Sequence, residues 1–211
     1  MTGGRFIVLE GGEGVGKSTQ AKLLADSLRQ QGFSVRQTRE PGGTEGAEAI
    51  RKLLLHPPGS GWGSRAEALL FAAARADHVE KVIRPALMGG EWVICDRFLD
   101  SSRAYQGGAG GVDDSQILQL HAIGSEDLRP DLTILIELDP ALSARRIALR
   151  DGEKTDAIGG REDEYHVAVA SSFHHFAEQA PDHYVLIDGA RPPAEIHGLI
   201  MGALTPLMDI V

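Results

Sequence analysis

Residues 11–18 read GGEGVGKS, a spacing of glycine, lysine and hydroxyl residues that suits the binding of phosphate groups. In this pattern backbone N–H groups surround phosphate oxygens, Lys17 reaches the terminal phosphates and the Ser18 hydroxyl binds Mg²⁺. An apolar run, FIVLE, precedes the loop and a helical pattern follows it, which is the setting that aims helix N–H groups at an anion. The alternative is a glycine-rich turn that binds no ligand. The pattern predicts a nucleotide-binding loop made of Gly11, Gly12, Glu13, Gly14, Val15, Gly16, Lys17, Ser18 and Thr19.

Charged residues follow two further apolar runs. Asp96 and Arg97 come after EWVIC, and Arg39 comes after the run at 34–38. Side chains at the carboxyl edge of a parallel sheet point into the ligand crevice, where Asp96 can hold the Mg²⁺ shell and the two arginines can clamp phosphates. The alternatives are a surface ion pair at 96–97 and, at REPGGT, a helix-entry turn with Thr44 as N-cap.

Three more side chains suit the rest of a nucleotide. Phosphates repel a nearby carboxylate unless a favourable contact offsets the repulsion. Glu13 is therefore predicted to accept a hydrogen bond from a sugar hydroxyl or to hold metal-bound water. Phe71 and Arg75 are four residues apart and share a helix face, where the ring can stack on a planar base while the guanidinium donates to it. The alternatives are a solvated loop acid, a core phenylalanine and an exposed arginine.

A glycine-rich segment at 151–160 is poor in hydrophobic residues and is flanked by arginines. This arrangement predicts a short mobile lid at about 150–161 whose cations neutralise charge during phosphoryl transfer. The alternative is a solvated helix end whose basic residues complement the helix dipole. The flanking arginines are Arg145, Arg146, Arg150 and Arg161.

These residues need a scaffold of alternating strands and helices. Apolar, β-branched runs predict strands at 5–10, 34–38, 92–95, 132–138 and 184–187. Helical spacing predicts helices at 17–31, 64–88, 113–124, 141–150, 162–179 and 194–207, and Ser64 and Glu67 have the spacing of a capping box. The alternation predicts an α/β fold with a five-stranded, mainly parallel sheet and helices on both faces. We expect one domain over residues 1–211, with the lid as a small addition.

The composition limits the classes of function. The 211 residues carry a formal net charge of −9, which disfavours polynucleotide binding. No apolar run approaches the ~20 residues of a membrane span, and the first residues lack the pattern of a secretion signal, so we expect no membrane association. The single cysteine, Cys95, cannot form an internal disulfide, which suits the cytoplasm.

Taken together, the motifs resemble the thymidylate kinase family, the dTMP kinases of the P-loop nucleoside-monophosphate kinase group. The matching motifs are FIVLEGGEGVGKSTQ at 6–20, REPGGT at 39–44, EALLFAAARADHV at 67–79 and DRFLDSSRAYQGG at 96–108. The last is the most specific, because a serine pair followed by AYQG resembles the thymidylate signature. The resemblance implies transfer of the γ-phosphoryl group of ATP to dTMP, with Mg²⁺, on the way to dTTP.

The resemblance also implies roles for individual side chains around the acceptor. Phe71 resembles the residue that stacks on thymine, and Arg75 resembles the one that donates to a base carbonyl. The pocket wall around base and deoxyribose is implied to be Ser102, Tyr105 and Gln106.

At the phosphates, the resemblance implies that Arg39 and Arg97 clamp the acceptor phosphate. Glu13 resembles the loop acid near the sugar 3′-hydroxyl, and Asp96 resembles the acid that supports Mg²⁺ together with Ser18.

The catalytic arginine is implied to come from the lid, because the phosphate-binding loop contains none. Arg150 and Arg146 are the candidates, with Arg161 third. The family also suggests a homodimer. Ala109, Gly110 and Gly111 stand where the family often carries an arginine–glycine pair, so an expected charge is missing.

Three other functions remain compatible with the sequence. The acceptor could be dUMP, another nucleoside monophosphate or a deoxynucleoside. A P-loop NTPase could instead transfer the phosphoryl group to water, and Asp139 at the end of an apolar run resembles its Walker B acid. An inactive binding module is the third alternative, against which the intact GKS and Asp96–Arg97 argue.

Overall fold

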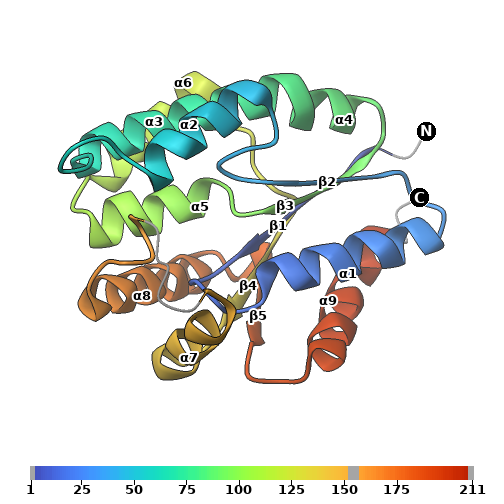
Figure 1. The fold of residues 1–211 in the computed structure, drawn as a ribbon. Helices are drawn as coiled ribbons and strands as arrows, with labels where there is room; N and C mark the ends of the chain where they lie inside the picture. The colour runs from blue at the N-terminus through green and yellow to red at the C-terminus, as the bar shows by residue number, and fades with distance from the viewer. Residues whose placement is uncertain (1–2, 152–156, 209–211) are drawn as a thin grey trace.

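The computed structural model describes residues 3–151 and 157–208, except for the side chains of residues 150 and 151. Its strands form one sheet in the order β2-β3-β1-β4-β5, and each neighbouring pair is parallel (Figure 1). This confirms the predicted α/β fold class. The strands are β1 (Phe6–Glu10), β2 (Val35–Arg39), β3 (Trp92–Asp96), β4 (Leu132–Glu137) and β5 (Tyr184–Asp188).

Helical segments connect the strands. The α-helices are α1 (Lys17–Gln30), α2 (Glu45–Leu55), α3 (Ser64–His78), α4 (Arg84–Met88), α5 (Leu99–Ser102), α6 (Asp114–Ser125), α7 (Pro140–Asp151), α8 (Asp163–Gln179) and α9 (Pro193–Met208). Two π-helical segments, η1 (Val79–Ile83) and η2 (Arg103–Ala109), and a 3₁₀ turn, η3 (Pro181–His183), complete the set.

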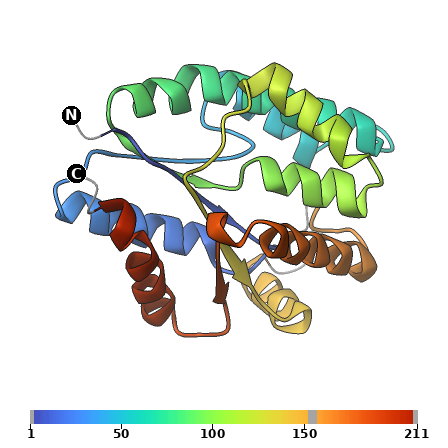
Figure 2. The same cartoon turned by 180° about the vertical axis from the view of Figure 1, so that it is seen from behind.

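The central strand β1 is buried on both faces, which explains its continuous apolar sequence. Alternate residues point to opposite sides, so Ile7 and Leu9 pack with α1 and α9 while Phe6 and Val8 pack with η1, α4 and α6. Two views related by a half-turn show α1 and α9 on one side of the sheet, with α2, α3, α4 and α6 on the other (Figures 1 and 2).

Two helix predictions require correction. The helix expected over 64–88 is a continuous helical run, but its residues 79–83 are π-helical. The capping box is wrong: the N-cap of α3 is Gly63, without a side-chain cap, and the Glu67 carboxylate instead faces Arg161 and Gln106. The tertiary partners of Glu67 outcompete the local backbone contact.

Helix α2 was not predicted from periodicity, although its N-terminal turn was. The Thr44 hydroxyl accepts a hydrogen bond from the backbone N–H of Ala47 at 3.0 Å, which confirms Thr44 as the N-cap. In the described parts of the chain, none of the helices combines the length and apolar character needed to cross a bilayer.

Candidate active site

The predicted phosphate-binding loop turns sharply out of β1. Gly11 has a φ of 132°, and a Cβ atom at this position would lie 2.2 Å from the carbonyl oxygen of Ile136 on β4. A side chain therefore cannot be accommodated without moving the backbone. Gly16, with a φ of 105°, is the N-cap of α1, so the first N–H groups of this helix face the loop.

A cavity of about 660 Å³ opens beside this loop. Its walls come from the loop, the carboxyl ends of β2 and β3, α3, η2, α7 and the connection from β5 to α9. Of the residues predicted from the sequence, the cavity is lined by Glu13, Gly14, Val15, Gly16, Lys17, Ser18, Thr19, Arg39, Phe71, Asp96, Arg97, Tyr105, Gln106 and Arg146. The fold thus brings most of the predicted donor and acceptor residues to one space.

The Lys17 side chain curls over the loop. Its ammonium group donates to the carbonyl oxygens of Gly11 at 3.1 Å and Gly12 at 2.5 Å. Burial, followed by repulsion from Arg97, lowers the pKa of Lys17 to about 8. An anion in the loop would oppose both effects, because it supplies a negative partner for the ammonium group.

Ser18 and Asp96 lie side by side although they are distant in sequence. The Ser18 hydroxyl donates to the Asp96 carboxylate at 2.5 Å. The Ser18 hydroxyl lies at the start of α1 and the Asp96 carboxylate at the end of β3, both next to the phosphate loop. Both groups offer oxygen atoms as metal ligands, and oxygen is the ligand atom that Mg²⁺ prefers.

The guanidinium of Arg97 joins the loop to the segment after β3. It donates to the carbonyl oxygen of Gly11 at 2.9 Å, to the Ser101 hydroxyl at 3.1 Å and to the Tyr105 hydroxyl at 3.2 Å. It also pairs with Glu13 at 3.4 Å and lies 5.0 Å from the centre of the Tyr105 ring. Arg97 therefore connects the predicted donor and acceptor sides of the cavity.

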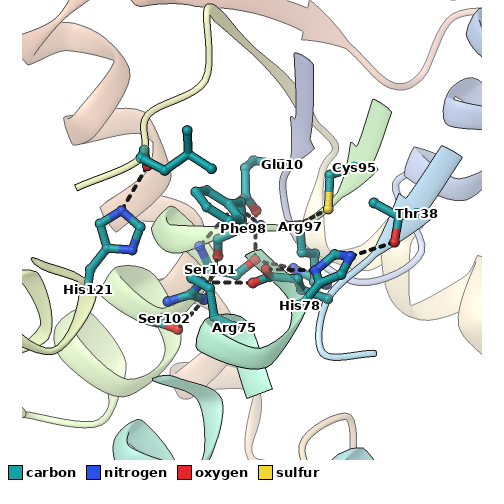
Figure 3. Close-up of polar contacts among 12 residues, drawn as sticks. Glu10, Thr38, Arg75, His78, Cys95, Arg97, Phe98, Ser101, Ser102 and His121 are labelled. Atoms are coloured by element: carbon teal, nitrogen blue, oxygen red, sulfur yellow. Dashed lines mark hydrogen bonds and ion pairs between the residues drawn. The ribbon is translucent and has the colours of Figure 1, made fainter. Parts of the chain in front are cut away.

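Arg97 needs support because its backbone is left-handed, with a φ of 70°. The support comes from Glu10, which the sequence analysis did not select. Its carboxylate accepts from the backbone N–H groups of Phe98 at 2.8 Å and Ser101 at 3.1 Å, and from the Ser101 hydroxyl at 2.6 Å (Figure 3). An acid at the end of an otherwise apolar strand was the signal that could have identified it.

Burial, followed by repulsion from Asp100, raises the pKa of Glu10 from 4.5 to about 7. A carboxyl group with these surroundings can take up a proton near neutral pH.

The predicted acceptor side of the cavity is built on η2, which carries Tyr105 and Gln106. Gln106 is 1% exposed; its amide N–H donates to Glu67 at 3.4 Å, and its Oε1 has no hydrogen-bond partner among the described residues. Phe71 faces the same space from α3. A ring, a phenol and an amide oxygen acceptor suit a planar polar ligand.

Arg103 fastens the start of η2 outside the cavity. Its guanidinium makes two 2.9 Å hydrogen bonds to Asp114 of α6 and one of 3.0 Å to Asp100, and it lies 3.9 Å from the centre of the Phe176 ring of α8. The forked contact is among the stronger kinds of ion pair because it fixes both distance and orientation.

Arg75 and Ser102 lie behind the cavity wall rather than on its lining. Arg75 is 3% exposed and donates to Glu40 at 2.8 Å, to the Phe98 carbonyl oxygen at 3.0 Å and to the Ser102 hydroxyl at 2.8 Å (Figure 3). His78 is the second partner of Glu40, at 3.1 Å. In the structure Arg75 links the loop after β2 to α5, and its predicted contact with a base stays a prediction.

Glu40 and His78 were not selected from the sequence. The His78 ring is completely buried and also contacts the Thr38 hydroxyl at 2.7 Å. The position of Glu40, between the end of a strand and a proline, was its only sequence signal.

The three lid cations occupy different surroundings. Arg146 lines the cavity and donates to the carbonyl oxygen of Gly189 at 3.0 Å. Arg161 lies outside the cavity lining and contacts Glu67 and Tyr165. Arg150 belongs to the last turn of α7, but its side chain, like residues 152–156 of the predicted lid, lies outside the described part of the structure.

Asp139 does not have the position of a water-activating acid. Its carboxylate accepts from the backbone N–H groups of Ala141 at 2.9 Å and Leu142 at 3.3 Å, at the start of α7. This is the geometry of a helix cap, which satisfies donors that the helix leaves free.

The phosphate-loop motif lies beside a cavity at the carboxyl edge of a five-stranded parallel sheet, which is the arrangement of a P-loop nucleoside-monophosphate kinase. Enzymes of this class are phosphotransferases that move a phosphoryl group between two nucleotides.

Comparison with known proteins identifies the family. A family model for thymidylate kinase matches residues 9–200. The thymidylate kinase of Rhizorhabdus wittichii is 53% identical over 97% of this chain and 99% of its own, and that of Chromohalobacter salexigens is 46% identical over 97% of both. The crystal structure of thymidylate kinase from Ehrlichia chaffeensis matches with a TM-score of 0.78 and 35% identity, over 96% of this chain and 98% of that one. The chain belongs to the thymidylate kinase family.

We predict a pH-dependent contribution of Glu10 to stability. Because its pKa is raised in the folded protein, the folded state holds a proton that the unfolded chain has lost, and this stabilisation disappears as pH rises from about 4.5 through about 7. Glu10→Gln keeps an acceptor for the two N–H groups but cannot titrate. The unfolding free energy of Glu10→Gln minus that of the native protein should increase by on the order of 2 kcal/mol from pH 5 to pH 8.

Urea unfolding at both pH values measures this difference. Glu80→Gln, which alters an exposed acid on η1, is the control and should show little change. Equal pH dependence of the native protein and Glu10→Gln would contradict the assignment.

Proposed function

We propose that this enzyme transfers the γ-phosphoryl group of ATP to dTMP and releases ADP and dTDP. The observation that carries this proposal is a shared cavity in which the phosphate-binding loop faces Phe71, Tyr105 and Gln106. The loop suits the phosphates of ATP, and the opposite wall suits a pyrimidine base. Membership of the thymidylate kinase family selects dTMP among the possible acceptors.

The reaction requires positioning and charge neutralisation rather than a strong base. The attacking oxygen belongs to the acceptor phosphate and is already anionic, so no proton has to be removed from it. Lys17 is the donor to the terminal phosphates of ATP, exchanging its contacts with the loop carbonyl groups for phosphate oxygens. Arg97, held by its neighbours on both sides of the cavity, and Arg39 bind the acceptor phosphate.

The oxygen donors Ser18 and Asp96 would hold Mg²⁺. The described residues contain no group of three or more histidine, cysteine or acidic side chains that could bind a metal, which fits an ion held by few protein ligands plus phosphates and water. When bound, Mg²⁺ would neutralise charge on the phosphates of ATP. Glu13, at the edge of the cavity, is proposed to accept from the 3′-hydroxyl of the acceptor.

The lid at 150–161 is proposed to supply the catalytic arginine. Arg150 and Arg146 share α7, whose N-terminal half touches the phosphate loop through a hydrogen bond from the Ser143 hydroxyl to the carbonyl oxygen of Glu13. A cation on this helix can therefore approach the phosphates while the loop binds them.

We further propose a cytoplasmic homodimer. Leu69 of α3 is 57% exposed and Ile123 of α6 is 82% exposed, and the two helices pack closely, with the Cα of Gly124 next to Ala76. Exposed apolar side chains on two packed helices suit burial against a second copy of the chain. The buried, unpaired thiol of Cys95 is compatible with a reducing compartment.

A panel of acceptors tests the proposed reaction. With ATP and Mg²⁺, phosphate should appear on dTMP in preference to dUMP, dCMP, dAMP, dGMP and thymidine, and ATP hydrolysis without an acceptor should be slow. Lys17→Ala should lower kcat by about 10²–10³ or more, because a charge that stabilises the transferring phosphoryl group is lost.

Lys22→Ala, which removes an exposed cation one turn further along α1, should retain activity. Release of phosphate into water as the main product would overturn the proposed function.

The lid proposal makes a separate prediction. Arg150→Ala should lower kcat more than it weakens dTMP binding, because the charge is needed as the phosphoryl group transfers. Steady-state kinetics beside equilibrium dTMP binding distinguish the two quantities. An effect confined to KM would move the role to Arg146 or Arg161.

The homodimer proposal predicts that Ile123→Lys, alone or with Leu69→Lys, shifts the sedimentation coefficient from that of a dimer toward that of a monomer. Met88→Lys serves as the control, because Met88 is 87% exposed but lies on α4. A native protein that sediments as a monomer at micromolar concentration would contradict the proposal.

A further inference from the structure

The described end of the lid is docked on the acceptor side of the cavity. The backbone N–H of Ala157 donates to the carbonyl oxygen of Leu55 at 3.3 Å. Ile158 is 8% exposed, lines the cavity and packs in the same apolar cluster as Phe71 and Tyr105. Residues 157 and 158, at the described end of the lid, therefore form part of the wall of the proposed acceptor pocket.

Arg161 lies at the end of this segment and contacts Glu67 and Tyr165, two side chains that support the acceptor wall from outside the cavity. One terminal nitrogen of its guanidinium pairs with the Glu67 carboxylate of α3, and the other donates to the Tyr165 hydroxyl of α8 at 2.5 Å. The guanidinium also lies 4.5 Å from the centre of the Tyr165 ring.

Each partner of Arg161 in turn holds a residue of η2. The other carboxylate oxygen of Glu67 accepts from the Gln106 amide N–H at 3.4 Å, and the Tyr165 hydroxyl donates to the carbonyl oxygen of Tyr105 at 2.6 Å. Burial raises the pKa of Tyr165 to about 12, and this hydroxyl, like any phenol, is a donor at neutral pH.

These contacts determine which atoms face the acceptor. A carboxylate only accepts, so Glu67 orients the Gln106 amide with its N–H group toward α3. The Oε1 atom of Gln106 is left as an acceptor with no partner among residues 3–151 and 157–208. The hydrogen bond from the Tyr165 hydroxyl to the Tyr105 carbonyl oxygen holds the backbone of Tyr105, which lies in the π-helical turn η2. The Tyr105 ring lies under the Arg97 guanidinium.

We propose that Arg161 is a positioning residue for the acceptor site: through Glu67 and Tyr165 it couples the placement of residues 157–161 to the orientation of Gln106 and Tyr105. This inference rests on the proposed function, and it gives Arg161 a different task from Arg146 and Arg150. The cations on α7 neutralise charge on the phosphates, whereas Arg161 supports the residues that bind dTMP.

The test compares Arg161→Met with the native enzyme. The KM and equilibrium Kd for dTMP should rise by about tenfold to a hundredfold, the scale expected when hydrogen bonds to a charged group are lost. The KM for ATP should stay within about twofold, and kcat should fall far less than the dTMP affinity. Arg36→Met, which removes an arginine paired with Glu91 at the start of β2, is the matched control and should leave all four constants unchanged.

Two further variants separate positioning from a general loss of structure. Tyr165→Phe removes only the hydroxyl between Arg161 and Tyr105, so it should weaken dTMP binding in the same direction without a large fall in Tm. Arg161→Lys, which keeps one charged donor, should restore part of the affinity. The effects of Arg161→Met and Tyr165→Phe should be less than additive, because both break one network.

The outcomes are distinct. An unchanged KM for dTMP with a kcat lowered by orders of magnitude would overturn the proposal and make Arg161 a cation for the transferring phosphoryl group. Equal losses for ATP and dTMP, in step with Tm, would reduce Arg161 to a structural role. A native enzyme that forms no dTDP would overturn the proposed function, and the inference with it, before any variant is compared.

Discussion

The site depends on the hydrogen bonds of the Arg97 guanidinium, whose side chain is 16% exposed. It contacts the carbonyl group at the start of the phosphate loop and the phenol of Tyr105 on η2, so it fixes the two halves of the cavity relative to each other. Its left-handed backbone would be strained in isolation. Glu10 offsets this strain by accepting from the next turn of the chain, and the acid sits at the end of the central strand.

The acceptor wall is held from several directions. Arg103 anchors the beginning of η2 to α6 through Asp114 and to α8 through the Phe176 ring. Tyr165 and Glu67 hold Tyr105 and Gln106 nearer the cavity. π-helical segments are rare, and the shape of this one is supported by side-chain contacts. This explains why polar pairs gather around one short segment.

Local charge in the cavity differs from the overall charge of the protein. The chain carries a formal net charge of −9, yet Lys17, Arg39, Arg97 and Arg146 line one cavity. Asp96 and Glu13 balance some of these cations, and the remainder suits two nucleotides that bring many negative charges together. Burial lowers the pKa of Lys17, which makes its ammonium group responsive to an arriving anion.

The sequence by itself determined the α/β class, the strand positions within a residue or two and the phosphate loop, because these follow from local patterns of apolar residues and glycines. Motifs also selected Phe71, Tyr105, Gln106 and Arg97, which the structure places around one cavity. Only the tertiary structure decided the surroundings of each side chain. Spacing on a helix cannot show that Arg75 lies behind the wall, or that Glu67 faces Arg161 instead of capping α3, since their partners are distant in the chain. The same reason hid Glu10, whose importance comes from a strained turn that begins 87 residues later, at Arg97.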